Sequence, residues 1–353
     1  MRILVATDAW RPQVNGVVRT YERLCEEAQK LGAEIDFLTP VAFHTVPAPT
    51  YPEIRLALPG FSVVRRKFAA AMPDAVHIAT EGPVGWMARA HCLSRRIPFT
   101  TSYHTRFPEY LRPRFGIPAP WTYRLMKAFH NAGAGVMVAS PSLAAELTER
   151  GFERILPWTR GVDTDQFAPR PVRRFGTGPV FLYVGRVAVE KNLSAFLDLK
   201  LPGRTVVVGE GPQLADLKAR YPSVLFAGKR TGDDLAECYA SADVFVLPSR
   251  TETFGIVQLE AMASGLPVAA FPVTGPVDLV QTGVTGILSD DLRQAALDAL
   301  TLDKAIVRAK SLEFSWENAA RLFLANIESA QFASLGRRVP KRRKLLGRRT
   351  ALG

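Results

Sequence analysis

Short apolar runs alternate with helix-forming segments twice along this chain, and this alternation restricts the fold more than any other feature of the sequence. Continuous apolar runs suit the buried strands of a parallel sheet, which are covered on both faces. Parallel strands need a crossover connection, usually a helix, and the intervening segments supply one. In the first series we expect strands at 2–6, 34–38, 75–78, 98–103 and 135–139, and helices at 17–31, 85–94 and 141–150.

The pattern breaks at residues 163–179, where proline, glycine and charged residues are frequent, as in domain linkers. We therefore predict an α/β fold of two facing, Rossmann-like doubly wound parallel-sheet domains with a cleft between them, spanning 1–168 and 169–313. A helix at about 314–332 is expected to pack back on the first domain, before a basic, disordered tail at 333–353. In the second domain we expect strands at 180–184, 204–208, 224–226, 244–247 and 268–270, and helices at 192–199, 213–220, 231–240 and 254–264.

Composition excludes several classes of protein. Cys25, Cys92 and Cys238 are too few and too widely spaced for a disulfide framework or a structural zinc site. No basic and then apolar leader precedes the first strand, and no apolar run approaches the ~20 residues that cross a bilayer. We expect a cytoplasmic protein without a signal peptide and without a metal site. No oligomeric state follows from the sequence.

The net charge of +12 is concentrated at the C-terminal end. Residues 331–353 hold eight bases and no acid. Such a segment can be a solvated tail, or it can bind an anionic membrane surface or a nucleic acid. Composition leaves these alternatives open.

The segment SRTETFGIVQLEAMASGLP, residues 249–267, is the most informative for function. Ligands of open α/β sheets bind outside the carboxyl ends of the strands, and this segment follows an apolar strand. Thr253, Phe254 and Gly255 are expected to open a helix whose amides face an anionic ligand. Glu260 then offers two acceptor oxygens to ribose hydroxyls, with Glu252 eight positions earlier. Two such glutamates alone would be ordinary helix-surface acids.

Three further segments follow strands. Arg186 and Lys191, after the strand at 180–184, can clamp a pyrophosphate, although they can also be solvated surface bases. Gly16 follows the first strand, where backbone amides can approach a phosphate, and the alternative is a plain turn. His104 can hydrogen-bond a sugar hydroxyl or cap a loop. Neither domain has the G-x-G-x-x-G dinucleotide fingerprint.

Together these segments resemble the retaining glycosyltransferases of family GT4, which have the GT-B fold, over nearly the whole body of the chain. The E-x7-E element with its G-R…E-K-N partner is the specific part, and R-G-V-D at 160–163 is similar to the family's interdomain N-G-V-D, with Arg160 in place of asparagine. The resemblance implies an N-terminal acceptor-binding domain, a C-terminal nucleotide-sugar-binding domain and transfer without a metal. It implies no cofactor, because the nucleotide sugar is a substrate.

The resemblance also implies roles for particular residues. Its catalytic residues are His104, Arg186, Lys191 and Glu252. Its donor-binding residues are Gly16, Val17, Arg186, Lys191, Arg230, Thr253, Phe254, Gly255 and Glu260. Arg230 lies near the expected nucleobase contact.

Residues 63–68 and 112–130 mix bases with aromatic and aliphatic residues, which suits a lipid interface or, alternatively, a core with a basic rim. The N-terminal sequence is also similar to that of the glycosyl-diacylglycerol synthase branch of the family. We therefore expect transfer of a hexosyl residue from a UDP-sugar to a lipid, diacylglycerol, by an enzyme on the cytoplasmic face of the membrane. A soluble GT4 enzyme using a saccharide or small-molecule acceptor, with GDP-mannose as a possible donor, and a nonenzymatic sugar-nucleotide sensor are alternatives. A basic nucleic-acid-binding protein is an alternative of another class, but no motif for nucleic acid is present.

Overall fold

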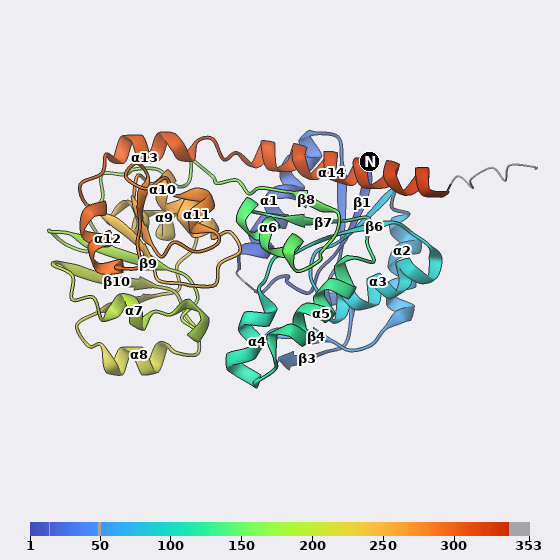
Figure 1. Cartoon of the computed structure of the whole chain (residues 1–353), viewed down its shortest axis with the longest axis horizontal. Helices are drawn as coiled ribbons and strands as arrows, with labels where there is room; N and C mark the ends of the chain where they lie inside the picture. The colour runs from blue at the N-terminus through green and yellow to red at the C-terminus, as the bar shows by residue number, and fades with distance from the viewer. Residues whose placement is uncertain (14, 49–50, 339–353) are drawn as a thin grey trace, which may run out of the picture.

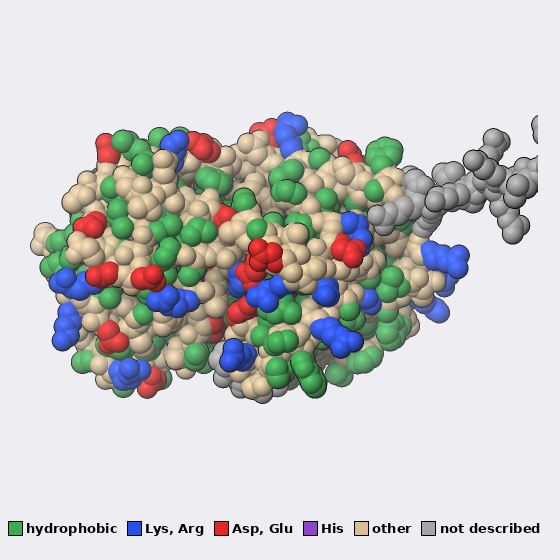
Figure 2. Space-filling model, in the orientation of Figure 1, with side chains coloured by type: hydrophobic (Ala, Val, Ile, Leu, Met, Phe, Trp, Pro, Cys, Tyr) green, Lys and Arg blue, Asp and Glu red, His purple; other side chains and the backbone are tan. Residues whose placement is uncertain are grey.

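Two α/β domains lie side by side in the computed structural model of the chain, which describes residues 1–13, 15–48 and 51–338 (Figure 1). Each domain is built on a six-stranded sheet whose neighbouring strands all pair in parallel. The prediction of two parallel-sheet α/β domains is therefore confirmed. The face in Figure 2 shows basic and acidic side chains interspersed over both domains.

The first sheet has the strand order β2-β1-β5-β6-β7-β8. Alternate residues of its strand β1 pack on opposite faces, with Leu4 in the cluster under α2 and α3, and Ile3 and Val5 in the cluster under α1 and α14. The strands are β1 (Arg2–Ala6), β2 (Glu34–Leu38), β5 (Ala75–Ile78), β6 (Phe99–Ser102), β7 (Gly135–Val138) and β8 (Ile155–Pro157), and an antiparallel hairpin joins β3 (Thr45–Ala48) to β4 (Tyr51–Ala57). The helices are α1 (Gly16–Lys30), the 3-10 turn η1 (Pro40–Ala42), α2 (Phe61–Ala71), α3 (Pro83–Arg95), α4 (Phe107–Phe115), α5 (Ala119–His130) and α6 (Pro141–Glu149).

The second sheet has the strand order β11-β10-β9-β12-β13-β14. Its central strands are apolar throughout and fully buried, as a doubly covered parallel sheet requires. The strands are β9 (Val180–Val184), β10 (Arg204–Val208), β11 (Leu225–Gly228), β12 (Val244–Leu247), β13 (Val268–Ala270) and β14 (Gly286–Leu288). The helices are the 3-10 turn η2 (Val189–Lys191), α7 (Ser194–Leu197), α8 (Leu214–Arg220), α9 (Gly232–Ala240), α10 (Ile256–Ala263), α11 (Pro276–Leu279), α12 (Leu292–Ala299) and α13 (Lys304–Ser311).

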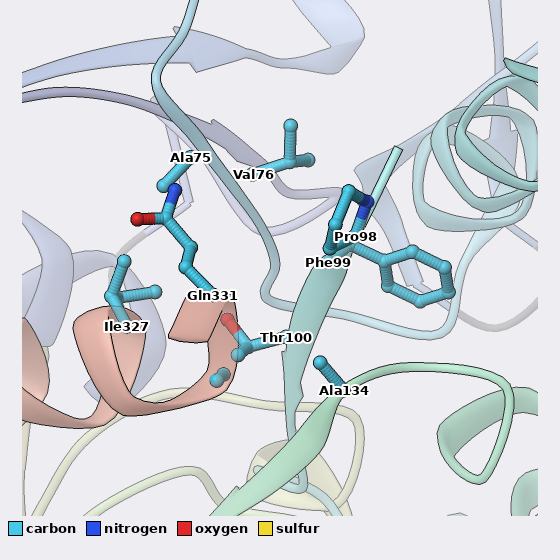
Figure 3. A pocket seen from close by; sticks show the side chains of 9 residues that line it. Ala75, Val76, Pro98, Phe99, Thr100, Ala134, Ile327 and Gln331 are labelled. Carbon is cyan, nitrogen blue, oxygen red and sulfur yellow. The ribbon is translucent and has the colours of Figure 1, made fainter. Parts of the chain in front are cut away.

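The last helix, α14 (Trp316–Arg338), leaves the second domain and runs back along the first (Figure 1). Trp158 Nε1 donates to the Ala319 carbonyl at 3.0 Å, and Phe323 is buried against the first sheet. Figure 3 shows Ile327 and Gln331 of α14 beside Ala75 of β5 and Thr100 of β6. The helix thus links the second domain to the far side of the first.

Three sequence expectations need correction. Residues 333–338 belong to α14 rather than to the tail, and the remainder of the expected tail, 339–353, lies outside the described residues. The helix expected at 254–264 begins only at Ile256, because Gly255 holds the N-cap with a φ of 84°. The helix expected at 192–199 is shorter, since η2 ends at Lys191 and α7 spans Ser194–Leu197.

Candidate active site

A cavity of about 690 Å³ lies between the two domains. The first domain contributes Arg19 of α1, and the second contributes Ile256 and Glu260 of α10. The connecting segment, residues 161–167, forms part of the wall. The helix that follows β1 therefore faces the helix that follows β12, at the edge of both sheets where α/β proteins bind ligands.

Glu260 lies on α10, and its buried carboxylate faces this cavity. Its Oε1 accepts from Arg19 Nη1 at 2.8 Å, and its Oε2 accepts from Tyr239 Oη at 2.8 Å. Burial raises the pKa of Glu260, while Arg19 and the Tyr239 hydroxyl oppose the rise. Because a carboxylate oxygen accepts more than one hydrogen bond, each oxygen keeps acceptor capacity for a ligand hydroxyl.

Glu252 and Lys191 form an ion pair, with 2.6 Å between Oε1 and Nζ. Burial, the largest single effect, lowers the pKa of Lys191, but the attraction of Glu252, Tyr110 and Tyr183 and the hydrogen bond to Glu252 together outweigh it, so the pKa of Lys191 is raised. The ammonium is thus charged, and it is the partner of Glu252 rather than a free clamp.

Side chains of the first domain donate hydrogen bonds to the backbone around Glu252. Arg106 Nε donates to the Glu252 carbonyl at 2.9 Å, and Tyr110 Oη donates to the Thr251 carbonyl at 3.3 Å. Ser140 Oγ donates to the Thr253 carbonyl at 3.1 Å. These bonds join α4 and the ends of β6 and β7 to the loop before α10, so the two domains meet at the predicted donor site.

His104 follows β6, and protein groups contact both nitrogens of its ring. Nε2 lies 3.1 Å from Tyr21 Oη, and Nδ1 lies 3.1 Å from Arg160 Nη2. Burial and then Arg160 hold the pKa of His104 well below its ordinary value, so the ring is neutral. Protein groups thus engage both ring nitrogens in this structure, and a hydrogen bond from His104 to a sugar hydroxyl stays a prediction.

Gly16 is the first residue of α1, and Asn15 caps the helix. Asn15 Oδ1 accepts from the amides of Val17 and Val18, each at 3.0 Å. The Val17 amide is therefore engaged by the cap and is not open to a phosphate. A Cβ built on Gly16 would lie 4.0 Å from Ile256 Cδ1, which shows how closely the N-termini of α1 and α10 approach each other across the cleft.

The other predicted residues surround this centre. Arg186 follows β9, and its carbonyl accepts from Tyr183 Oη at 2.9 Å. Arg230 follows β11 on the rim and pairs with Asp234 at 3.1 Å. Thr253 Oγ1 donates to the His104 carbonyl at 3.0 Å. Phe254 is buried, and Gly255 has a φ of 84°, a left-handed conformation that favours glycine before α10.

Sequence reasoning missed Arg19, Tyr239 and Arg106. Arg19 lies three positions after Gly16, one helical turn on, so its place on the same face as the predicted phosphate-facing glycine was a usable signal. Tyr239 lies on α9, and Arg106 lies two positions after His104. Nothing in the spacing of either marks it as a partner of the E-x7-E element.

Within residues 1–13, 15–48 and 51–338, no group of three His, Cys, Asp or Glu side chains is placed to hold a metal ion. No helix in this described part of the chain is long and apolar enough to cross a membrane.

Comparison with known proteins identifies the family. The glycosyltransferase family 4 model matches residues 14–166, and a model described as glycosyl transferases group 1 matches residues 178–302. A GDP-mannose-dependent alpha-mannosyltransferase of Mycobacterium tuberculosis is 32% identical, over 82% of this chain and 83% of that protein. This chain belongs to glycosyltransferase family 4. It is therefore a glycosyltransferase, and the resemblance seen in its sequence is confirmed.

This GT4 chain is also similar to an alpha-monoglucosyldiacylglycerol synthase of Streptococcus pneumoniae, at 27% identity over 90% of this chain and 83% of that protein. Among solved structures, sucrose-phosphate synthase from Thermosynechococcus elongatus superposes with a TM-score of 0.75 at 22% identity, over 94% of this chain and 99% of that one. The fold is GT-B, as expected.

Proposed function

We propose that this enzyme transfers a hexosyl residue, with retention and without a metal ion, from a UDP-sugar to diacylglycerol at the cytoplasmic membrane surface. The observation that supports a lipid acceptor best is that two helices of the first domain expose apolar and basic side chains: Phe61 and Arg65 of α2, and Trp121, Arg124 and Leu125 of α5. We call these five side chains together the α2–α5 surface.

Helix α5 divides its side chains between core and solvent. Tyr123, Met126 and Phe129 are buried, whereas Trp121 is 76% exposed and Leu125, four positions later on the same face, is also exposed. The exposed Arg124 lies between them in sequence. An exposed tryptophan, a leucine and an arginine on one helix suit the boundary between acyl chains and headgroups.

Helix α2 repeats this division. Val64 and Phe68 belong to the core, whereas Phe61 and Arg65, again four positions apart, are exposed. In the segments 63–68 and 112–130, some aromatic and aliphatic side chains are therefore core, and others are exposed, as contact with lipid would require. Among the expected interface residues, the side chains of Arg114 and Phe115 lie outside the described part of the chain.

The residues of the cleft suggest how transfer proceeds. Glu260 accepts the ribose hydroxyls, and Arg186 and Lys191 stabilise the diphosphate as it leaves. Glu252 is paired with Lys191, and we propose that it lies near the transferred sugar. We further propose that the acceptor attacks from the leaving group's own face, with a donor phosphate oxygen taking its proton, while the protein provides position and charge.

A second candidate is transfer of mannose from GDP-mannose to a saccharide or small-molecule acceptor. The 32% identity to the M. tuberculosis GDP-mannose-dependent enzyme favours this donor. The face in Figure 2 mixes acids with bases, and on this face nothing favours the nucleic-acid alternative.

The test is a matrix of nucleotide sugars and acceptors. The full chain is incubated with labelled UDP-glucose, UDP-glucuronate or GDP-mannose, and with diacylglycerol in phosphatidylglycerol vesicles, a short-chain diacylglycerol in detergent, or a soluble oligosaccharide. Label in the vesicle lipid supports the proposal, and label only in the oligosaccharide overturns the lipid acceptor.

A variant pair tests the α2–α5 surface itself. Trp121→Ala combined with Leu125→Ala should lower turnover on vesicles about tenfold or more, because two apolar side chains no longer enter the lipid, and should spare the detergent-dispersed acceptor. Phe332→Ala, which removes a 75% exposed aromatic from α14, is the matched control. Equal losses in both variants would contradict a role for this surface.

A further inference from the structure

Arg160 is a buried arginine without a carboxylate partner among the described residues. It is 3% exposed and begins the R-G-V-D segment between the domains. Its Nη1 donates to the Trp158 carbonyl at 2.6 Å and to the Thr159 carbonyl at 3.0 Å. Its guanidinium stacks on the Trp158 ring, 3.9 Å from the centroid. Three contacts thus fix the guanidinium against Trp158 and Thr159, the two residues that precede it.

The fourth contact of Arg160 determines the state of His104. Arg160 Nη2 lies 3.1 Å from His104 Nδ1, and a guanidinium can only donate. Nδ1 must therefore accept, and the proton of the neutral ring sits on Nε2. Because Nε2 lies 3.1 Å from Tyr21 Oη, that N–H donates to the tyrosine oxygen.

Tyr21 connects this pair to buried polar groups of the first sheet. With its oxygen accepting from His104, Tyr21 can donate to His77 Nε2 at 2.9 Å or to Ser102 Oγ at 3.5 Å. His77 Nε2 also lies 2.9 Å from Ser102 Oγ, and His77 Nδ1 lies 2.8 Å from Thr100 Oγ1. Burial lowers the pKa of His77 to about 3, so this ring is also neutral. Arg160 therefore sets the directions of two hydrogen bonds, its own to His104 and that from His104 to Tyr21.

His104 also connects to the donor loop of the second domain. Thr253 Oγ1 donates to the His104 carbonyl at 3.0 Å, and Thr253 lies next to Glu252. The His104 ring is thus held by Arg160 and Tyr21, while its backbone carbonyl holds the loop before α10. His104 therefore joins Arg160, α1 and this loop.

We propose that Arg160 is a positioning residue that fixes His104 as the neutral Nε2–H tautomer and holds it beside the loop before α10 for sugar transfer. The guanidinium acts through His104: it directs the Nε2–H to Tyr21 Oη and keeps in place the residue whose carbonyl accepts from Thr253. This inference rests on the proposed function for its role in transfer, whereas the tautomer follows from the geometry alone.

Nitrogen-15 NMR of histidine-labelled protein tests the tautomer. The chain has five histidines, and His104→Gln identifies the signals of the ring in question. We expect the Nε2–H pattern for His104 in the wild type and in Arg160→Lys, since an ammonium also only donates. Arg160→Gln should lose that pattern, because an amide can donate or accept. Tyr21→Phe should keep it, because Arg160 and not Tyr21 selects the tautomer.

Kinetics test the role in transfer. Arg160→Gln should lower kcat about tenfold or more while the donor KM stays within about twofold, and Arg160→Lys should restore part of the loss. An unchanged tautomer in Arg160→Gln, or a switched tautomer in Tyr21→Phe, overturns the proposal. A changed tautomer with normal kcat overturns the role in transfer.

The remaining outcomes are also decisive. If Arg160→Gln does not fold, the Tyr21→Phe and Arg160→Lys spectra still decide which residue sets the tautomer. If the wild type transfers no sugar to any acceptor while its spectra follow the expectation, the proposed function fails and the tautomer assignment stands.

Discussion

Arg19 Nη1 of α1 lies 2.8 Å from Glu260 Oε1 of α10, so a cation of the first domain holds the carboxylate proposed to bind the ribose in the second. Arg19 is partly open to the cavity, whereas Glu260 is buried. Ribose hydroxyls must share or replace the guanidinium as partners of this carboxylate. Donor binding is thereby linked to the contact between the domains.

Glu260→Ala should weaken binding of the nucleoside diphosphate by about 2 kcal/mol, or about 30-fold, because hydrogen bonds to a charged acceptor are lost. Calorimetry with UDP and with GDP measures the change. The released Arg19 can turn to solvent, so the domain should remain folded. Glu149→Ala, an exposed acid at the end of α6, is the control. Unchanged affinity in the Glu260 variant would remove the ribose assignment.

Lys191→Met should lower turnover by about 100-fold while nucleoside binding changes less, because the ammonium stabilises charge that develops on the departing diphosphate. Arg186→Met should act in the same direction. Lys191→Met also leaves Glu252 buried without its cation, so Lys191→Met combined with Glu252→Gln should recover stability but not turnover. Lys218→Met, on the exposed face of α8, controls for loss of a charge. Normal turnover in both site variants would show the pair to be structural.

Activity should survive a chelator. The proposed stabilisation of the diphosphate comes from Arg186 and Lys191 rather than from a metal ion. Turnover is compared in EDTA, in added magnesium and in added manganese. Loss of turnover in EDTA with recovery in either metal would count against this mechanism.

Acid should destabilise the first domain through His77. The pKa of His77 in the fold is about 3, mainly through burial, whereas an unfolded histidine has an ordinary value of 6.5. Below about pH 6.5 the unfolded chain therefore takes up a proton that the folded chain does not, and the stability due to the neutral ring falls by about 1.4 kcal/mol per pH unit. That stability is fully present above this pH.

Urea unfolding followed by tryptophan fluorescence reports chiefly this domain, which holds four of the five tryptophans. His77→Gln should lose one proton's worth of pH dependence between pH 6.5 and 5 relative to the wild type. His44→Gln, at an exposed position, should match the wild type. Identical slopes for all three proteins would refute the buried neutral ring.

The sequence predicts those parts of this molecule that depend on local pattern. Strands at 2–6, 34–38 and 75–78 in the first domain have the predicted bounds, since short apolar or alternating runs between helices leave few alternatives. Three-residue strands such as β8 and β14 escape prediction because they lie at sheet edges and are set by pairing with β7 and β13.

The candidate site is likewise predicted only in part from local sequence pattern. The spacing of Glu252 and Glu260 marks the donor segment, but the partners that fix their carboxylates come from far along the chain. Lys191 is 61 positions from Glu252, and Arg19 is 241 positions from Glu260. The ring state of His104 depends on Arg160, which reaches it only because β8 brings the connecting segment to the same edge of the sheet. No local sequence pattern predicts such contacts between residues that are far apart along the chain.

Deleting residues 339–353 should leave the fold intact and reduce binding to anionic vesicles. This segment holds six bases and no acid, and α14 ends before it at Arg338. Each base near an anionic bilayer contributes about 1 kcal/mol, and the attraction fades as salt shortens the screening length. The residues proposed for catalysis all precede the deletion, so turnover on a detergent-dispersed acceptor should persist.

A full-length variant with the six bases replaced by glutamine separates charge from length and should bind like the deletion. Co-sedimentation with phosphatidylglycerol vesicles across a salt series is the measurement. Equal binding by all three proteins would show that attachment depends on the α2–α5 surface alone, and tail-dependent binding to RNA but not to vesicles would return the nucleic-acid alternative.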